Sequence, residues 1–200
     1  MPRRQVACIF ALLCFAVSCS PRDFLTRRLA TDLIAGSDTF KTTQLFWLRT
    51  GVVSNKDYQS PEYVVLRRRG WVIGNGVACP PDVAPAPCWD MVITPLGVDV
   101  LRDWVTASAA SSQYISVPVA QRELLAVTGI HKNGTVADVD FQWRWAAVND
   151  VGAALYAKGT EYNSTVSFMH YDDGWRLIES SAMKSAQGLN DALRNASPLQ

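Results

Sequence analysis

The sequence predicts an α+β protein in which an antiparallel β-sheet meander packs against N-terminal and central helices. The first half contains helix-start signals, a hydroxyl residue followed by proline, at Ser60-Pro61 and Thr94-Pro95. The second half contains alternating apolar and polar segments around two turn signals, Asn133-Gly134 and Asp172-Asp173-Gly174. Hydrophobic residues make up 48% of the chain, which is enough for a core and excludes a disordered protein.

Length and charge exclude further classes of protein. The 200 residues have room for one domain, or for two very small ones. A formal net charge of +1 excludes a strongly basic nucleic-acid binder, and two histidines exclude a histidine-rich metal site. We therefore expect no nucleic-acid partner, no metal and no cofactor.

Residues 1–18 have the features of a removable leader. Arg3 and Arg4 provide a positive start, and the apolar run Val6–Val17 is 12 residues long. A bilayer span needs about 20 apolar residues, so the run predicts a signal sequence instead of a transmembrane helix. The tetrapeptide Ala16-Val17-Ser18-Cys19 resembles the lipobox of bacterial lipoproteins, in which the cysteine receives the lipid.

This resemblance implies lipidation of Cys19, for example with palmitate, and anchoring of residues 19–200 to a membrane of the cell envelope. Ser20 after the lipidated cysteine points to the periplasmic face of the outer membrane. Two alternatives remain: ordinary signal-peptidase cleavage, because Ala16 and Ser18 also fit a small-x-small site, and a retained leader. Without the leader the chain has 17 basic and 18 acidic residues, so membrane attachment must come from the acyl chains.

The cysteines fall into three groups. Cys8 and Cys14 belong to the leader. Cys79 and Cys88 are separated by a proline-rich loop and can pair in the oxidising compartment that export implies. This pair is predicted to be structural, because a redox motif has Cys-x-x-Cys spacing. Cys19 is left over, and an exported protein seldom keeps an idle thiol, which favours acylation.

Capping and turn residues divide the first half of the mature chain into helices and strands. Ser20-Pro21 predicts the start of a helix that carries an apolar stripe of leucines and ends at Gly36. The stretch 107–112 is a flexible connection that would separate lobes 20–106 and 113–182 if the domain were divided. The other expected elements are a strand at Lys41–Arg49, a polar turn at 54–57, a helix at 61–69, strands at Trp71–Val77 and Trp89–Ile93, and a helix from Pro95 through Val105.

A β meander is predicted for the second half. Pro118 lacks an N–H group, so Tyr114–Val119 is expected to be an edge strand. A weakly helical tail is expected to fray from about Met183. The remaining strands are expected at Arg122–Lys132, Thr135–Ala147, Thr165–Tyr171 and Trp175–Glu179.

The Asn133-Gly134 turn sets the register of the first hairpin. Asn-Gly is the leading signal for a type I′ turn. The register makes one face apolar on both strands and leaves an ion pair on the other. The predicted cross-strand pairs are Ile130 with Ala137, Leu124 with Trp143, and Glu123 with Arg144.

Four side chains of the predicted sheet are candidates for ligand contact: Trp143, Trp145, His170 and Arg176. The Trp143/Trp145 alternation can form a stacking platform for sugars or aromatic ligands, or both rings can fill the core. His170 is expected beside the last turn, opposite Arg176, where the arginine would keep the imidazole neutral as a base. The alternative for His170 is a structural role near a sheet end.

Other polar clusters have structural explanations. Asp138 and Asp140 share one face of a strand, where a solvated face is favoured over a cation site. Arg67-Arg68-Arg69 ends a predicted helix, whose dipole the cations offset, while phosphate contact is the alternative. The segment Tyr63–Gly97, with LRRRGWV and ITPLG, resembles the helix and wing of winged-helix regulators, which implies DNA contact. Export and a Cys79–Cys88 pair argue against that function.

The segment FMHYDDGWRLIE resembles the closing hairpin of NTF2-like folds. That resemblance implies a pocket within a curved sheet, lined by His170 or an aspartate, and a small ligand-binding domain, hydrolase or isomerase. The sequence has no Gly-x-Ser-x-Gly and no His-Glu-x-x-His motif, so no catalytic residue is predicted. The function we expect is a non-catalytic binding or structural module of the envelope, whose partner is an envelope protein or a small ligand.

Overall fold

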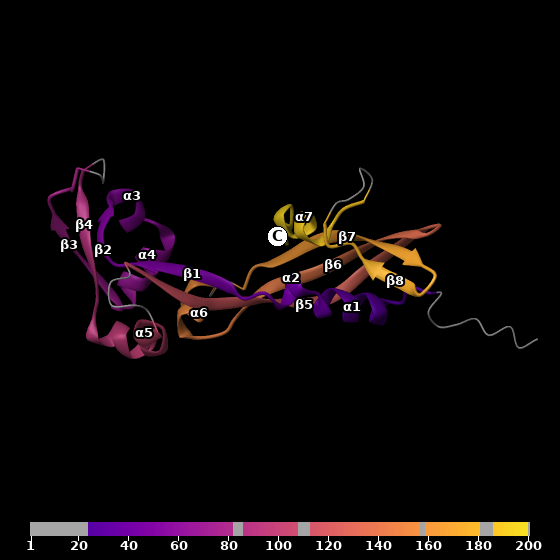
Figure 1. Ribbon diagram of the computed structural model, residues 1–200, viewed down its shortest axis with the longest axis horizontal. Coiled ribbons are helices and arrows are strands. Elements are labelled where there is room, and N and C mark those ends of the chain that lie inside the picture. The colour runs from indigo at the N-terminus through magenta and orange to yellow at the C-terminus, as the bar shows by residue number, and fades with distance from the viewer. Residues whose placement is uncertain (1–23, 82–85, 108–112, 157–158, 181–185, 200) are drawn as a thin grey trace, which may run out of the picture.

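A computed structural model describes residues 24–81, 86–107, 113–156, 159–180 and 186–199. It confirms the α+β class, with helices and antiparallel strands. The molecule is elongated: a small sheet with α3, α4 and α5 lies at one end, and long strands with α1 and β8 reach the other (Figure 1).

The helices are short and the strands of the second half are long. The helices are α1 (Arg27–Gly36), α2 (Asp38–Lys41), α3 (Asn55–Tyr58), α4 (Pro61–Arg68), α5 (Pro95–Ala107), α6 (Asp150–Leu155) and α7 (Leu189–Arg194). The strands are β1 (Gln44–Arg49), β2 (Gly51–Ser54), β3 (Val72–Val77), β4 (Cys88–Ile93), β5 (Tyr114–Asn133), β6 (Val136–Ala147), β7 (Glu161–Tyr171), β8 (Gly174–Leu177) and β9 (Ser197–Pro198).

The strands form two antiparallel sheets. The larger sheet has the order β1-β5-β6-β7-β8, and β9 pairs with β7. From β5 to β8 the neighbours in the sheet are neighbours in the chain, as in a meander. The smaller sheet has the order β2-β4-β3 and lies between β1 and β5 in the sequence.

Strand β5 is one continuous strand of 20 residues, where two shorter strands were expected. The expected break between the two strands is wrong, because Pro118 does not interrupt β5. The expected edge position of Tyr114–Val119 is confirmed, because β1 is the one strand that pairs with these residues in the described part of the chain. Pro118 pairs with Leu45 of β1, next to an irregularity in the register, while the pairing of β5 with β6 begins only at Ala120. Before Ala120, β5 therefore pairs with β1 alone. The missing N–H group of Pro118 breaks no hydrogen bond to β6, because β6 does not pair with this part of β5.

The β5–β6 hairpin turns at Gly134-Thr135, with positive φ at Gly134 alone. This pattern fits a type II′ turn, because type I′ requires positive φ at both central residues. Close to the turn the predicted register is wrong, since Ile130 faces Val139. Two register shifts, between Leu124 and Ala126 and between Val127 and Gly129, then restore the predicted alignment.

Beyond these shifts the predicted pairs of the first hairpin are confirmed. Leu124 faces Trp143, and Glu123 faces Arg144. The Arg144 Nε donates to a Glu123 carboxylate oxygen over 2.7 Å. The neighbouring position of the same register places Arg122 opposite Trp145.

The N-terminal helix begins later than predicted. Thr26 caps α1, and its hydroxyl accepts a hydrogen bond from the Leu29 N–H. The predicted start at Ser20-Pro21 lies outside the described residues. Gly36 is the last residue of α1, close to the predicted end.

Two short helices occupy segments for which other structures were expected. Ser37 caps the one-turn helix α2, so the strand expected from Lys41 begins only at Gln44. Ser54 caps α3, which replaces the expected polar turn. Both are cases in which a serine oxygen satisfies an N–H group at a helix start, as the residue type favours.

In the described part of the C-terminal tail, α7 and β9 pack against the large sheet, which corrects the prediction that these residues fray. Leu189 and Ala192 of α7 are buried, and β9 pairs with β7 through Asn163 and Tyr162. The short helix is held by the apolar surface that it buries, because six residues are too few for a stable isolated helix.

The buried apolar side chains form two clusters. The first joins α1, α2 and α7 to the sheet, and its largest fully buried members are Phe141 and Phe168. The second lies around β1, the small sheet, α4 and α5, with Leu48 and Leu66 among its buried residues. Strand β5 contributes to both: Val127 belongs to the first cluster, and its N-terminal part belongs to the second.

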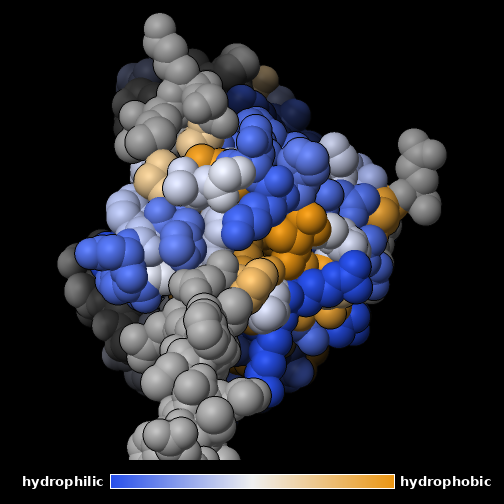
Figure 2. Space-filling view, turned by 90° about the vertical axis from the view of Figure 1, so that its right-hand side faces the viewer, coloured by the Kyte–Doolittle hydropathy of each residue, from blue (hydrophilic) through white to orange (hydrophobic). Residues whose placement is uncertain are grey.

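The end of the molecule near the start of α1 carries an apolar surface surrounded by polar groups (Figure 2). Phe24 is 57% exposed there. The Lys132 ammonium lies 5.9 Å from the Phe24 ring and 5.2 Å from the Trp175 ring. Arg27 donates to the Thr128 carbonyl, which ties the start of α1 to β5.

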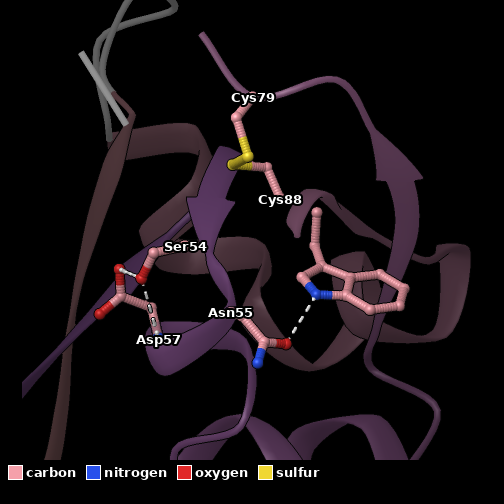
Figure 3. Close-up of a disulfide and its surroundings, with 6 residues drawn as sticks. Ser54, Asn55, Asp57, Cys79 and Cys88 are labelled. Atoms are coloured by element: carbon pink, nitrogen blue, oxygen red, sulfur yellow. Dashed lines mark hydrogen bonds between the residues drawn. A yellow bond between two sulfur atoms is a disulfide. The ribbon is translucent and has the colours of Figure 1, made fainter. Parts of the chain in front are cut away.

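The predicted disulfide is present in the structure. The sulfurs of Cys79 and Cys88 are 2.07 Å apart (Figure 3). Cys88 is completely buried at the start of β4. Nearby, Ser54 caps α3, and the Trp89 indole donates to the Asn55 side chain (Figure 3).

We predict that the double variant Cys79→Ala/Cys88→Ala loses about 2–3 kcal/mol of unfolding free energy, since the bond closes a short loop in the unfolded chain. Urea unfolding monitored by tryptophan fluorescence measures the loss. A reducing agent provides the control, because it should destabilise the wild type and leave the double variant unchanged. Equal midpoints for wild type and variant would contradict a structural role.

Candidate functional site

The candidate site is a cavity between the large sheet and α7. Its volume is about 670 Å³, within the range of ligand sites of roughly 300–1,000 Å³. We call it the arginine cavity. It is lined by Arg122, Trp143, Trp145, Tyr162, Ser180, Asn190, Asp191, Leu193, Arg194 and Ala196.

Aromatic rings form one wall of the arginine cavity. Trp143 and Trp145 alternate along β6 and therefore point to the same side of the sheet. Their rings meet edge to face with centroids 5.6 Å apart, and Tyr162 of β7 stacks on Trp143 at 4.8 Å. Trp143 is only 3% exposed, whereas Trp145 is partly buried.

Hydrogen bonds tie this aromatic wall to α7. The Trp143 indole N–H donates to the Ser164 hydroxyl over 3.0 Å, and that hydroxyl donates to the Ala192 carbonyl over 3.0 Å. Both bonds are buried. The wall is thus positioned by the sheet on one side and the C-terminal helix on the other.

Arg122 is the main charged group on the same wall. Its guanidinium carbon lies 4.5 Å from the Trp145 ring centroid and 5.8 Å from that of Trp143, within cation–π distance. One guanidinium nitrogen donates to the Thr39 carbonyl over 2.7 Å, which holds the side chain in place. Burial lowers the pKa of Arg122 from its ordinary value.

Arg122 has no acidic partner within the described part of the chain. The ion pairs formed by described residues do not include it. Its Nε atom is buried and has no hydrogen-bond partner among the described residues. A partly buried cation without a counter-charge is costly, and a ligand anion would offset that cost.

Helix α7 supplies the polar side of the cavity. Arg194 pairs with Asp191 over 3.1 Å, one turn earlier on the same helix. The Asn190 amide donates to the Glu179 carbonyl over 3.2 Å. A second arginine at the cavity therefore has a carboxylate partner, in contrast to Arg122.

Two of the four predicted ligand-contact residues line the arginine cavity, and two do not. Trp143 and Trp145 lie in its wall. His170 instead pairs with Trp175 across the β7–β8 hairpin, with ring centroids 5.0 Å apart. The predicted pairing of His170 with Arg176 is wrong by one position, because the hairpin turn is shorter than expected.

Arg176 faces Met169 and has local partners. Its guanidinium bonds to the carboxylate of Asp173 in the turn and lies 4.9 Å from the Tyr171 ring. That carboxylate raises the pKa of Arg176. The Arg176 side chain is exposed and is not among the residues that line the arginine cavity.

The paired aspartates bond to neighbours on β7. The Ser167 hydroxyl donates to Asp138 over 2.7 Å, and the Thr165 hydroxyl donates to Asp140 over 2.6 Å. Among the described residues there is no group of three or more acidic, histidine or cysteine side chains that could hold a metal.

The basic end of α4 is used for packing. The Arg67 guanidinium stacks over Tyr58 at 3.7 Å and donates to the Tyr58 carbonyl. Tyr58 in turn stacks on Trp89 with centroids 4.1 Å apart. Arg68 and Arg69 are exposed, as expected for charges at a helix C-terminus.

Comparisons of the chain with protein-family models, curated proteins and solved structures gave no match. No helix in the described ranges is both long and apolar enough to cross a bilayer. Cys19 and the leader lie outside those ranges.

Sequence reasoning missed Arg122, Tyr162 and the residues of α7. A signal for Arg122 was present, because the predicted hairpin register already places it opposite Trp145. No comparable signal marks α7, whose contacts with β7 depend on the tertiary fold.

Proposed function

We propose that the protein is a non-catalytic binding module of the cell envelope, anchored by lipid at Cys19 on the periplasmic face of the outer membrane. In this proposal the sheet and the N-terminal and C-terminal helices form a rigid frame. The arginine cavity is the ligand site, and it takes a small molecule with a carboxylate or phosphate group and a flat apolar part.

The observation that carries the ligand proposal is Arg122. Its guanidinium is partly buried, has no acidic partner among the described residues, and lies against two tryptophan rings. A guanidinium offers paired N–H donors that match a carboxylate or phosphate. Trp143 and Trp145 provide apolar surface beside that charge, as in sites that orient a ligand by one polar contact.

The position of Phe24, the first residue that the structure describes, supports the anchoring proposal. Phe24 lies five residues after Cys19. Five extended residues span at most about 18 Å. Acyl chains on Cys19 would therefore hold the apolar end surface near Phe24 and Lys132 close to the bilayer (Figure 2).

We predict that Cys19→Ser moves the protein from the membrane fraction to the soluble fraction, because the acyl chains are the proposed source of attachment. Fractionation of envelopes followed by immunoblotting measures the shift. Wild-type protein in the same preparation is the control. A Cys19→Ser variant that stays with the membranes would refute acyl anchoring.

We predict that phenyl phosphate binds the wild type and that Arg122→Gln weakens binding about tenfold or more, since a charged hydrogen bond is lost. Isothermal titration calorimetry measures the affinity. Arg102→Gln is the matched control: Arg102 is an exposed arginine of α5 and lies outside the lining of the arginine cavity. Equal affinities for wild type and Arg122→Gln would reject the arginine cavity as an anion site.

A further inference from the structure

A second cavity adjoins the arginine cavity and shares two of its walls, Trp145 and Tyr162. Its volume is about 430 Å³. We call it the apolar cavity. Its other lining residues are Val65, Ala154, Leu155, Tyr156, Gly159 and Thr160.

The lining of the apolar cavity is aliphatic and aromatic except at Gly159 and Thr160. Trp145 and Tyr156 approach each other there, with ring centroids 5.9 Å apart. Leu155 and Tyr156 belong to the partly buried margin of the second core cluster, and Trp145 to that of the first. The cavity thus lies where the two clusters meet.

A third and smaller hollow of about 250 Å³ adjoins the apolar cavity. It shares Val65, Leu155 and Tyr156 with the apolar cavity and extends to Phe46 and Glu62. The shared walls place the three hollows in series, with Arg122 in the first and Glu62 in the last.

The two ends of this series of hollows carry opposite charges. At one end Arg122 provides a positive charge that has no acidic partner among the described residues, beside the Asp191–Arg194 ion pair. Glu62 provides a negative charge at the other, and together with burial, which is the larger cause, it raises the pKa of Tyr156. An anionic group is attracted to the first hollow and repelled from the last, while the segment between them suits hydrocarbon.

We propose that the site binds a single-chain anionic amphiphile, with its carboxylate or phosphate head at Arg122 and its hydrocarbon chain in the apolar cavity. This inference rests on the proposed function, because it names the class of ligand for the same site. The chain runs from the first cavity into the second alongside Trp145 and Tyr162, the two residues that line both cavities. A lipid-derived anion and any other fatty anion share this chemistry.

The test uses the full chain carrying Cys19→Ser, which has no acyl chains of its own to compete for the site. Phenyl phosphate, hexyl phosphate, dodecyl phosphate and dodecyltrimethylammonium are titrated calorimetrically below their micelle concentrations. Each buried methylene is worth about fourfold in affinity. Dodecyl phosphate has six more methylenes than hexyl phosphate, and burial of only three of them already gives about sixtyfold. We therefore expect dodecyl phosphate to bind at least about thirtyfold more tightly than hexyl phosphate, and the cationic amphiphile to bind more weakly than dodecyl phosphate.

Two variants separate the head from the chain. Thr160 is exposed and lines the apolar cavity, so Thr160→Trp should fill the cavity without disturbing the core. We expect it to remove the chain-length preference and leave phenyl phosphate affinity unchanged. Arg122→Gln should weaken all three phosphates about tenfold or more. Thr106→Trp, on the exposed side of α5, is the matched control for the added ring.

The outcomes distinguish this inference from the proposed function. Equal binding of hexyl and dodecyl phosphate, both sensitive to Arg122→Gln, overturns the amphiphile and leaves the anion site standing. A chain-length preference that persists in Thr160→Trp overturns the placement of the chain. Binding of dodecyl phosphate that Arg122→Gln does not weaken, or equal binding of the cationic amphiphile, overturns both proposals.

Discussion

Gly152→Ala is expected to lower the unfolding free energy by about 3 kcal/mol or more. A Cβ atom at this position would lie 1.7 Å from the Val119 carbonyl oxygen and 2.8 Å from its carbon. Backbone cannot move aside as a flexible side chain can, so α6 must shift away from β5 or the strand must bend. The expected loss is large for a single methyl group because that group would collide with main-chain atoms of β5.

The surroundings of Gly152 make such a shift costly. Asn149 caps α6 by accepting a hydrogen bond from the Gly152 N–H over 2.9 Å, and its amide donates to the Pro118 carbonyl. The Val148 N–H donates to the Val119 carbonyl over 3.1 Å. Moving α6 would strain the two of these bonds that reach β5, at Pro118 and Val119, where the strand has a single strand partner.

Urea unfolding monitored by circular dichroism measures the loss. Gly36→Ala is the matched control, because no atom lies within 4 Å of a Cβ at Gly36. That variant should be neutral or slightly stabilising, since alanine favours a helix over glycine. A loss below about 1 kcal/mol for Gly152→Ala would show that the contact relaxes easily.

The two hairpins show how far local signals determine the fold. Asn133-Gly134 and Asp172-Asp173-Gly174 mark both turns, and alternation marks the strands. In the β5–β6 hairpin the predicted register near the turn was nevertheless wrong, because bulges change the pairing without changing the apolar pattern of one strand. Register near the turn follows from both strands together, and that information is not local.

The tail illustrates the opposite case. Leu189, Ala192 and Leu193 are buried in the first core cluster. The tail was predicted to be weakly helical, but six helical residues show too little periodicity to predict that this helix packs against the sheet. Their burial depends on β7 and Trp143, which lie far away in the sequence. The half of the arginine cavity formed by α7 could therefore not be predicted, while the half formed by Trp143 and Trp145 could.

Trp143→Ala is expected to cost about 3–5 kcal/mol of unfolding free energy, as for a large aromatic side chain removed from a core. The ring is 3% exposed, stacks on Tyr162, and lies edge to face against Phe40 at 6.5 Å. Removal of the indole also leaves the buried Ser164 hydroxyl without the N–H group from which it accepts a hydrogen bond. Trp143→Ala should therefore disrupt both the aromatic wall of the cavity and the hydrogen bonds through Ser164 to Ala192 of α7.

Trp47→Ala is the matched control for this prediction, because Trp47 is 59% exposed on β1. An exposed tryptophan contributes little to the core, so the change should stay within about 0.5 kcal/mol. Thermal and urea unfolding of both variants compare the two positions directly. Equal losses at Trp143 and Trp47 would mean that the aromatic wall is not part of the stabilising core. A large loss at Trp143 alone means that the frame of the ligand site and the core share one set of contacts, and that binding mutations are better made at Arg122 and Thr160.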